Sequence, residues 1–450
     1  LSVCYYKKVG LKYYLMKGSN RKLIAFIIVF SGQMAFSLSE KSFSNIEERN
    51  EATYSVARRL TNEMSAFPAV DESEAMIEKF MEKWNIAGAS VAITKDERLI
   101  YSKGFGYADT STNEAVEPKH LFRIASVSKL ITAVSVMKLV DDGKIGLNDL
   151  VFGENGILNS SRYSEIKDPR IKKITVKQLL THSAGWSHFH GDPIFMPYTI
   201  VNTMGVPLPL DLETTIEYTL KHQNLSYEPG TDCAYSNFGY VLLGVIIEKV
   251  TEMNYEQYVS SEILNPIGIY DMQLGSSTLA GRKENEVKYY SNSRYKDAFS
   301  SFKKGKIVPR QYGGNNFNLL GAAGAWIGSS AELMKLLVHI DGRSSKKDIL
   351  PEEMIEKMVS VEGKSYPMGW MSTNQKDTWK RTGTLTGTSA LLKRSSDGLA
   401  WTILINTNND LGHDFTRNLD SLMTSVVDNI PEWPDYDLFY YNTPKSLFAY

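Results

Sequence analysis

The sequence predicts an α+β fold, in which a mostly antiparallel β-sheet is flanked by helices and carries an inserted all-helical lobe. Two segments far apart in the 450-residue chain, 89–109 and 388–407, alternate apolar and polar residues on both sides of a polar turn, as β-hairpins do. Between about 145 and 310 the chain shows helical segments joined by long loops, and no strand pattern. Strands near both ends indicate one sheet built from both, with an active site expected in the cleft beside the inserted lobe.

The N-terminal segments are expected to lie outside the folded body. Residues 1–15 are interpreted as upstream sequence that is not normally translated, because Met16 stands where an initiator would. Residues 16–37 have the parts of a secretory signal peptide: basic residues, an apolar run over 23–30 and a small-x-small end. Residues 38–71 are a polar leader that either wraps around the body or stays loose.

The signal peptide predicts an exported protein, periplasmic or secreted in a bacterium, that meets the membrane only transiently. A single membrane anchor, which would make a membrane-held regulator, is the alternative, although the apolar run is short for a span. Without residues 1–37, Cys233 is the only cysteine left, so an intrachain disulfide is impossible. Export without disulfides suits a bacterial periplasm. The formal net charge of −1 gives no reason to expect nucleic acid as a partner.

The elements of the body begin at about residue 72. Helices are predicted where apolar residues recur at helical spacing, over 74–86, 122–144, 237–252 and 330–340. The first hairpin, 89–109, precedes the second of these helices, and the second hairpin, 388–407, has its turn from Ser395 to Gly398. The aromatic-rich tail, residues 429–450, is expected to pack on the surface.

The helix over 122–144 contains the first candidate site. Its apolar residues recur at helical spacing and would face a core: Leu130, Val134, Met137 and Val140. Ser126 and Lys129 share one face and do not fit that pattern. A serine hydroxyl becomes a nucleophile when a base takes its proton, and a lysine can be that base when burial and a helix N-terminus lower its pKa. The same helix end can point a backbone N–H at a developing oxyanion.

The Ser-x-x-Lys spacing by itself is a weak signal. It occurs eight times in the chain, with Ser135–Lys138 as one further example. Taken alone, Ser126 would be interpreted as a helix cap beside a lysine that extends to solvent. Other segments must therefore support the catalytic interpretation.

A second segment, Tyr235-Ser236-Asn237, follows a Pro-Gly turn and directly precedes a buried helix. A phenol close to Lys129 would have its pKa lowered by the cation and could transfer protons. The amide of Asn237 could bind a substrate amide. The same tripeptide at 290–292 lies in a polar loop with no helix after it, and it is given no function.

The third segment, Arg381-Thr382-Gly383, opens into the C-terminal hairpin. Gly383 and Gly387 permit close backbone approach along a strand. The guanidinium of Arg381 would be a fixed cation in the cleft, able to bind a carboxylate bidentately. On its own, however, the segment could be an ordinary Gly/Thr turn.

Taken in order, these segments resemble the three motifs of the penicillin-binding-protein and class C β-lactamase superfamily: Ser126-x-x-Lys129, Tyr235-x-Asn237 and Arg381-Thr382-Gly383. The likeness covers about residues 72–428 and includes the phrases GASVAITKDERLIYSKGFGYAD, ITVKQLLTHSAGW and GAAGAWIGSSAELMKLL. It implies a β-lactamase/DD-peptidase-like domain over these residues, with the helical lobe inserted at about 145–310. It implies no cofactor.

The resemblance also implies a role for each matching residue. Ser126 would be the acylated nucleophile, Lys129 its partner in proton transfer and Tyr235 the general base and acid. Substrate would be bound by Asn237, Arg381, Thr382, Gly383 and Thr384, with the backbone N–H groups of Ser126 and Thr384 as the oxyanion hole. The family usually has Lys or His where this chain has Arg381. An arginine keeps the charge but cannot relay a proton.

The sequence thus predicts an exported serine hydrolase that cleaves ester, amide or D-amino-acid peptide substrates through an acyl-enzyme on Ser126. Its partner would be a small-molecule or peptide substrate. A β-lactamase proper is one alternative. A catalytically silent module that binds peptidoglycan-like ligands is another, and the altered Arg381 keeps it open.

Two other segments could suggest a metal site or a cysteine nucleophile. His182, His188, His190 and Asp192 could suggest a metal, but no Cys or Glu completes a ligand set, so no metal is predicted. Cys233 lies two residues before Tyr235. No His or Asn is placed to orient its sulfur, so a small buried thiol is expected there.

Overall fold

The structure is a computed structural model that describes residues 13–17, 23–27, 55–374, 378–408 and 413–440. It divides into two units, residues 1–53 and 54–450. In the first unit, β1 (Tyr13–Lys17) pairs antiparallel with β2 (Leu23–Ile27). Most of the expected upstream segment, signal peptide and leader lies outside the described residues. No described helix has the length and apolar character needed to cross a membrane.

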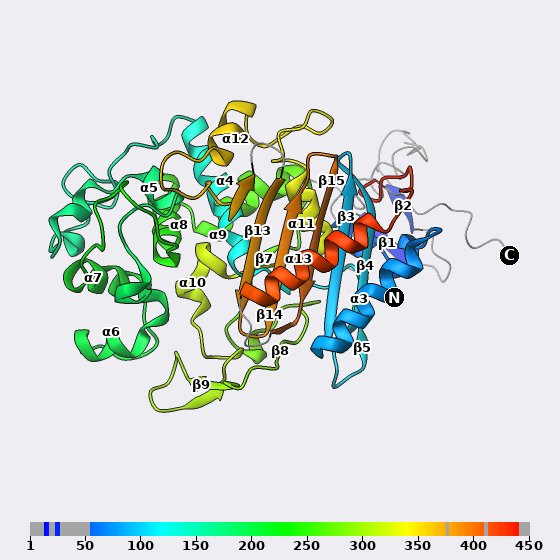
Figure 1. The fold of residues 1–450 in the computed structure, drawn as a ribbon, viewed down its shortest axis with the longest axis horizontal. Helices are drawn as coiled ribbons and strands as arrows, with labels where there is room; N and C mark the ends of the chain where they lie inside the picture. Colours follow the sequence, from blue (N-terminus) through cyan, green and yellow to red (C-terminus); the bar gives the residue numbers. More distant parts are fainter. Residues whose placement is uncertain (1–12, 18–22, 28–54, 375–377, 409–412, 441–450) are drawn as a thin grey trace. The chain divides into compact units, whose positions relative to one another are not determined.

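The central sheet of the second unit has seven strands in the order β12-β13-β14-β15-β3-β4-β5, and all neighbours are antiparallel (Figure 1). The strands are β3 (Gly88–Lys95), β4 (Arg98–Asp109), β5 (Glu114–Ala115), β12 (Ser372–Asn374), β13 (Thr378–Leu385), β14 (Thr388–Arg394) and β15 (Leu399–Ile405). Both predicted hairpins are confirmed. The pairing of β15 with β3 joins them, so the sheet is built from both ends of the chain as expected.

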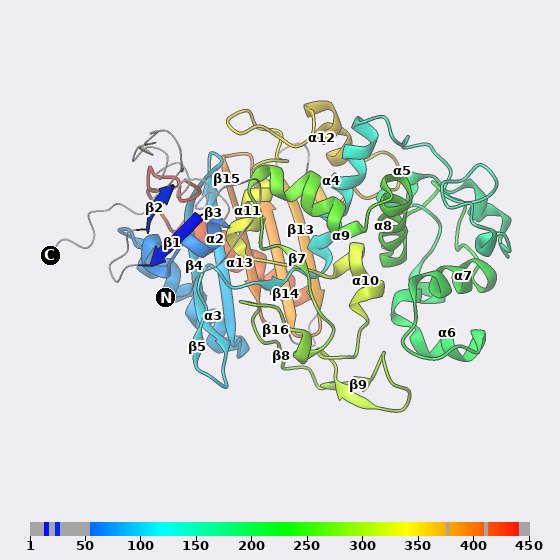
Figure 2. The same ribbon diagram turned by 180° about the vertical axis from the view of Figure 1, so that it is seen from behind.

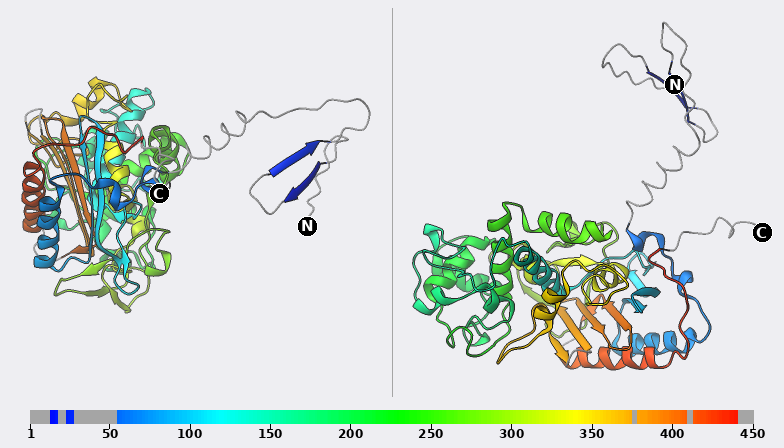
Figure 3. Two further views of the ribbon diagram at one scale, coloured as in Figure 1. Left: turned by 90° about the vertical axis from the view of Figure 1, so that its right-hand side faces the viewer. Right: turned by 90° about the horizontal axis from the view of Figure 1, so that it is seen from above.

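One face of this sheet is covered by α3 (Val70–Trp84) and α13 (His413–Asp428), and the other by helices from the middle of the chain (Figure 3). Successive side chains along β3 point to opposite faces of the sheet, so this one strand contributes to the core on each face. Val91 and Ile93 pack with Met423 of α13, whereas Ala92 belongs to the larger core on the opposite face.

The helix α4 (Ser128–Asp141) lies in that larger core, next to α8 (Asn237–Thr251) and α10 (Phe317–Gly324). The sequence predicted one apolar face, but α4 is buried on nearly every side, and Val140 of the predicted face is only half-buried. A helix enclosed by a sheet and other helices excludes water all round. Its ionisable residue Lys129 is therefore buried as well.

Helices form most of the lobe (Figure 2), namely α5 (Val176–Leu180), α6 (Pro197–Met204), α7 (Leu212–His222), α8 and α9 (Tyr255–Tyr258). The expectation of no strand within 145–310 is wrong for its last part. Four short strands occur there: β7 (Gln273–Leu274), β8 (Tyr290–Ser291), β9 (Asp297–Phe299) and β10 (Ile307–Pro309). Strands of two or three residues are too short to show a period of two.

The remaining elements attach the lobe and the chain ends to the sheet. β11 (Trp326–Gly328) lies between β6 (Phe122–Arg123) and β7, while β16 (Thr407–Asn408) pairs with β8, and α11 (Ser330–Leu337) and α12 (Glu352–Val359) follow. In the described part of the leader, α2 (Val56–Arg59) is anchored where Ser55 Oγ donates to Glu332 Oε1, 2.8 Å away. In the tail, the N–H of Leu438 donates to the carbonyl of Leu99 on β4, at 2.7 Å.

Candidate active site

Ser126 lies in a single 3₁₀ turn, Ala125–Val127, immediately before α4. The preceding Ala125 has a φ of 47°, a left-handed conformation that is strained for a residue with a Cβ atom. The turn is closely approached by β13: a Cβ atom on Gly383 would lie 2.3 Å from the Ile124 carbonyl oxygen and 2.9 Å from the Ser126 nitrogen. Glycine at 383 therefore lets the strand reach the turn, as the sequence predicted. At Gly387 the glycine is needed for a φ of 87°.

Lys129 lies one turn after Ser126, and its side chain is completely buried. Its Nζ atom donates to Asn237 Oδ1 at 2.7 Å, to the Ala323 carbonyl at 2.5 Å and to Ser126 Oγ at 3.4 Å. Burial lowers the pKa of Lys129 to about 8; the Tyr235 hydroxyl opposes this shift and the charge of Arg381 adds to it. The amine that faces Ser126 can therefore lose a proton near neutral pH.

The Tyr235 hydroxyl lies between two cations. It accepts a hydrogen bond of 2.9 Å from Arg381 Nη2, and Lys129 Nζ is 4.9 Å from the centre of the ring. Burial raises the pKa of Tyr235, but the charges of Arg381 and Lys129 outweigh burial and bring the pKa down to about 8. Tyr235 and Lys129 are thus close enough to exchange a proton, as their spacing with Ser126 suggested.

Arg381 occupies a different position from the one expected for it. Its side chain is 1% exposed, its Nε donates to the Ser126 carbonyl at 2.8 Å, and its Nη2 binds Tyr235. The predicted bidentate grip on a substrate carboxylate does not fit the Nε–Nη2 edge, because both of its donors are already used inside the protein, whereas the buried Nη1 has no hydrogen-bond partner among the described residues. Side chains alternate along β13, so Arg381 and Gly383 face the Ser126 turn while Thr382 and Thr384 line the pocket.

Asn237 is held by a residue that the sequence indicated only as a possible metal ligand. One oxygen of Asp192, Oδ2, accepts hydrogen bonds from the backbone N–H and the side-chain Nδ2 of Asn237, at 3.0 and 2.9 Å. This fixes the amide so that its Oδ1 atom faces Lys129. A local sequence pattern does not predict a contact between residues 45 positions apart, so the role of Asp192 could not be predicted from the sequence.

His182, one of the residues considered as a metal ligand, packs beside Tyr235 instead. His182 is buried, its Nδ1 accepts from the Ser236 N–H at 3.1 Å, and its ring packs against Tyr235 and Tyr240. Burial, together with the positive charges of Arg381 and Lys129, holds the pKa of His182 well below 6.5, so the imidazole is neutral. Within the described ranges, no group of three or more metal-ligating side chains occurs.

The repeated tripeptide at 290–292 and Cys233 take no part in this chemistry. The repeated tripeptide forms β8 and its continuation, where Asn292 Nδ2 donates to the carbonyls of Trp84 and Asn85. Cys233 is half-buried rather than buried, and burial together with Asp232 raises the pKa of its thiol. The sulfur is therefore a poor nucleophile.

A pocket of about 550 Å³ brings the candidate residues together between β13 and the lobe. Its polar lining consists of Ser126, Tyr235, Asn237, Thr382, Thr384 and Thr416, and its remaining walls are apolar or aromatic, including Phe195, Leu320, Tyr366, Met371 and Leu385. Among the described residues that line it, none carries a charged side chain. The expected cleft beside the lobe is therefore present, and the described residues on its surface are uncharged.

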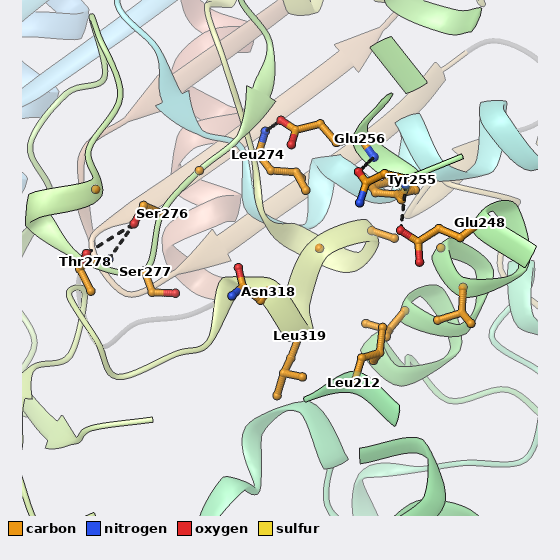
Figure 4. Close-up of a pocket in the computed structure, with 18 of the residues that line it drawn as sticks. Leu212, Glu248, Tyr255, Glu256, Leu274, Ser276, Ser277, Thr278, Asn318 and Leu319 are labelled. Atoms are coloured by element: carbon orange, nitrogen blue, oxygen red, sulfur yellow. Dashed lines mark hydrogen bonds between the residues drawn. The ribbon is translucent and has the colours of Figure 1, made fainter. Parts of the chain in front are cut away.

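A larger cavity of about 720 Å³ lies on the other side of α10 (Figure 4). Its wall includes Glu248, Glu256 and Leu319, and it contains none of the candidate catalytic residues. Leu320 and Ala323 line the Ser126 pocket, whereas Leu319 and Ala322 line this cavity, so α10 separates the two. Size alone would have selected the wrong cavity as the active site.

The position of Arg381 predicts the pH dependence of catalysis. At low pH, Lys129 and Tyr235 both hold their protons, and acylation requires the pair to lose one. Because both pKa values are lowered to about 8, we expect kcat/KM for a neutral ester to rise with pH around pH 8. The Arg381→Met variant removes a charge that lowers both pKa values, and we expect this rise to move to higher pH by roughly one unit or more.

The measurement is a profile of kcat/KM between pH 6 and pH 10. The neighbouring lysine provides a control, because Lys380 pairs with Asp420 at 3.1 Å and does not interact with Tyr235. Lys380→Met should leave the pH profile unchanged. Arg381→Lys keeps a positive charge, so its rise in kcat/KM should lie at a lower pH than that of Arg381→Met, closer to wild type. A profile that is the same in Arg381→Met and wild type would show that Arg381 does not lower the pKa values of Lys129 and Tyr235.

Comparison with known proteins agrees with the three motifs. The sequence model of the β-lactamase family matches residues 74–422. The Staphylococcus aureus protein flp (strain NCTC 8325) is 25% identical over 382 residues, covering 82% of this chain and 68% of the relative. The octameric penicillin-binding protein homologue from Pyrococcus abyssi superposes with a TM-score of 0.58 at 26% identity, covering 75% of this chain and 73% of that one.

A D-amino acid amidase from Ochrobactrum anthropi SV3, solved with D-phenylalanine, superposes with a TM-score of 0.62 at 18% identity, covering 80% of this chain and 98% of that one. At this identity the likeness concerns the fold. The family match spans the whole region that carries the three motifs, from α3 to the C-terminal helix. The chain therefore belongs to the β-lactamase family of serine hydrolases, whose fold it shares with penicillin-binding proteins.

Proposed function

We propose that this protein is an exported hydrolase that cleaves neutral esters or amides through an acyl-enzyme on Ser126. The observation that carries the proposal is the buried amine of Lys129, 3.4 Å from Ser126 Oγ and with a pKa lowered to about 8. A buried lysine with this shift is suited to proton transfer, whereas a solvated one is not. Membership of a serine hydrolase family is consistent with this assignment.

The chemistry follows from the positions of the side chains. Ser126 Oγ attacks the carbonyl carbon as its proton passes to the Lys129–Tyr235 pair. The negative charge that develops on the carbonyl oxygen would be stabilised by the backbone N–H groups of Ser126 and Thr384. The bond to the leaving group breaks as Tyr235 returns the proton to it, giving the acyl-enzyme. Water, activated by the same pair, then releases the acid and restores Ser126.

The pocket lining favours one group of substrates among those that the sequence left open. β-Lactams and peptides with a free C-terminus present a carboxylate close to the scissile bond, and a buried carboxylate is stabilised most by a cation that binds it directly. Arg381 is engaged with Ser126 and Tyr235, and no charged side chain is among the described residues of the pocket. Neutral esters and amides are therefore proposed in preference to β-lactams and D-alanyl peptides.

The test is a matched pair of substrates: a depsipeptide ester with a free terminal carboxylate and the same depsipeptide as its methyl ester. We expect kcat/KM to be at least about tenfold higher for the methyl ester, a difference of about 1.4 kcal/mol. Benzylpenicillin is measured in parallel. A preference for the free acid, or rapid turnover of the penicillin, would overturn the substrate assignment in favour of a peptidase or a β-lactamase.

Export remains part of the proposal and rests on residues 16–37. The mature N-terminus, determined by mass spectrometry of the protein expressed in a bacterium with its full leader, should lie near Leu38 or Glu40. A mature chain that retains residues 16–37 in the membrane fraction would support the membrane-held alternative instead.

A further inference from the structure

A second hollow adjoins the Ser126 pocket at the end of β13. We name it the Phe299 groove; it has a volume of about 580 Å³ and is lined by Phe195, Asp297, Ala298, Phe299, Ile307, Arg310, Gly314, Asn315 and Thr386. Phe195 lines both the groove and the Ser126 pocket. Thr386 directly follows Leu385, which lines the Ser126 pocket. The two hollows therefore lie next to each other at Phe195 and at the end of the strand.

Three large apolar side chains of the groove are exposed to solvent: Phe195 is 42% exposed, Phe299 61% and Ile307 64%. Single exposed apolar residues are ordinary, but several that line one hollow beside a reaction pocket indicate a binding surface. These three side chains line one hollow, and covering them with an apolar ligand is favourable because it removes apolar surface from water.

The groove is held in shape before any ligand arrives. Phe299 and Ile307 belong to the paired strands β9 and β10, which form a hairpin beside the lobe (Figure 1). Tyr198 of α6 donates to the Ser300 carbonyl at 3.0 Å, and its ring packs against Phe299 with 5.6 Å between the ring centres. The hairpin is thereby fixed to the lobe, so little ordering is required on binding.

The charges of the groove do not select an ion. Asp297 and Arg310 are its two charged residues among those described, and they have opposite signs. Arg310 Nη2 lies 3.5 Å from the Asp297 carbonyl oxygen. A surface with balanced charge and three exposed apolar side chains suits an uncharged hydrocarbon chain or aromatic ring.

The direction of the strand shows which part of a substrate would reach the groove. The leaving group must lie close to the Tyr235 hydroxyl, which returns its proton, and that hydroxyl is bound by Arg381. Thr384, whose N–H would contact the oxyanion, lies between Arg381 on β13 and Thr386 in the turn that follows the strand. The acyl portion therefore extends away from Arg381 and toward Thr386, where the groove begins.

We propose that the Phe299 groove binds the apolar acyl chain of an elongated substrate whose carbonyl carbon lies at Ser126. This inference rests on the proposed function and adds a substrate class to it, esters or amides of medium-length apolar acids. Thr386 follows Thr384 by two residues and lies at most about 7 Å from it, so an acyl chain of roughly six to eight carbons would reach past Thr386.

The experiment compares p-nitrophenyl acetate, butyrate, hexanoate and octanoate, which share one leaving group. Each methylene that becomes fully buried raises kcat/KM by up to about fourfold, so we expect the octanoate to exceed the butyrate by about tenfold or more. The Phe299→Ser and Ile307→Ser variants should reduce this ratio to about twofold or less. As controls, Tyr270→Ser and Leu279→Ser alter side chains that are 40% and 46% exposed and line neither hollow, and they should keep the wild-type ratio.

The outcomes separate the two proposals. If wild type hydrolyses the acetate in a Ser126-dependent manner but Phe299→Ser and Ile307→Ser retain the full chain-length ratio, the groove is not the acyl site while the hydrolase remains. If no ester is cleaved, or cleavage persists in Ser126→Ala, the proposed function itself fails.

Discussion

Replacing Ser126 by alanine is expected to lower kcat by roughly 10⁴- to 10⁶-fold and to abolish covalent labelling by a fluorophosphonate. The Ser126 hydroxyl is the group that we propose to form the acyl-enzyme, and loss of a nucleophile of this kind costs about that much in other serine hydrolases. The measurement is intact mass after exposure to the reagent, together with the rate of ester hydrolysis. Stability should change little, because the contact between Ser126 Oγ and Lys129 Nζ is long, at 3.4 Å.

The chain supplies a matched control for this variant. Ser135 also belongs to a Ser-x-x-Lys sequence on α4, but its hydroxyl is buried and donates to the Ile131 carbonyl at 2.9 Å. Ser135→Ala should therefore be labelled like wild type. If wild type itself reacts with neither the fluorophosphonate nor a penicillin, the catalytic interpretation is wrong and a ligand-binding module becomes the better description. An adduct that survives in Ser126→Ala would place the nucleophile elsewhere.

Replacing Lys129 by methionine is expected to lower kcat by about 10²- to 10⁴-fold, the usual contribution of a positioned general acid or base. Methionine matches the length and apolar stem of lysine but cannot carry a proton. The variant also removes the cation that, with Arg381, lowers the pKa of Tyr235, so both partners of the proton-transfer pair are lost. The measurement is the acylation rate in single-turnover experiments with a neutral ester.

Two further variants test whether Lys129 acts through its proton. Lys138→Met alters a half-buried lysine on the same helix that forms an ion pair with Asp142, and it should leave acylation unchanged. Lys129→Arg keeps a positive charge that cannot be released at working pH, and it should remain as slow as Lys129→Met. An arginine variant that restores acylation would mean that Lys129 contributes charge alone.

The sequence contained enough information to predict the large elements and the three motifs. The hairpins at 89–109 and 388–407 are visible because alternation with a period of two depends only on which face of a strand is buried. The motif residues Ser126, Lys129, Tyr235 and Asn237 were found by their local context, and the structure brings their side chains together around one pocket.

The short strands after residue 272 and the nearly complete burial of α4 were not predicted. A pairing of two or three residues has no period to detect, and an apolar helix looks similar in sequence whether one face or all faces are covered. Both depend on what packs against the element, which a local pattern does not contain.

The sequence by itself therefore determined the family and the motifs from which the reaction chemistry is proposed, because the types and order of the motif residues are local properties. Only the tertiary structure decided what the site can bind. It turned Arg381 inward onto Tyr235, set Asp192 against Asn237, and placed Phe299 beside the end of β13. The physical reason is that these arrangements join residues distant in the chain, and the direction of each side chain follows from strand register and packing rather than from its neighbours in sequence.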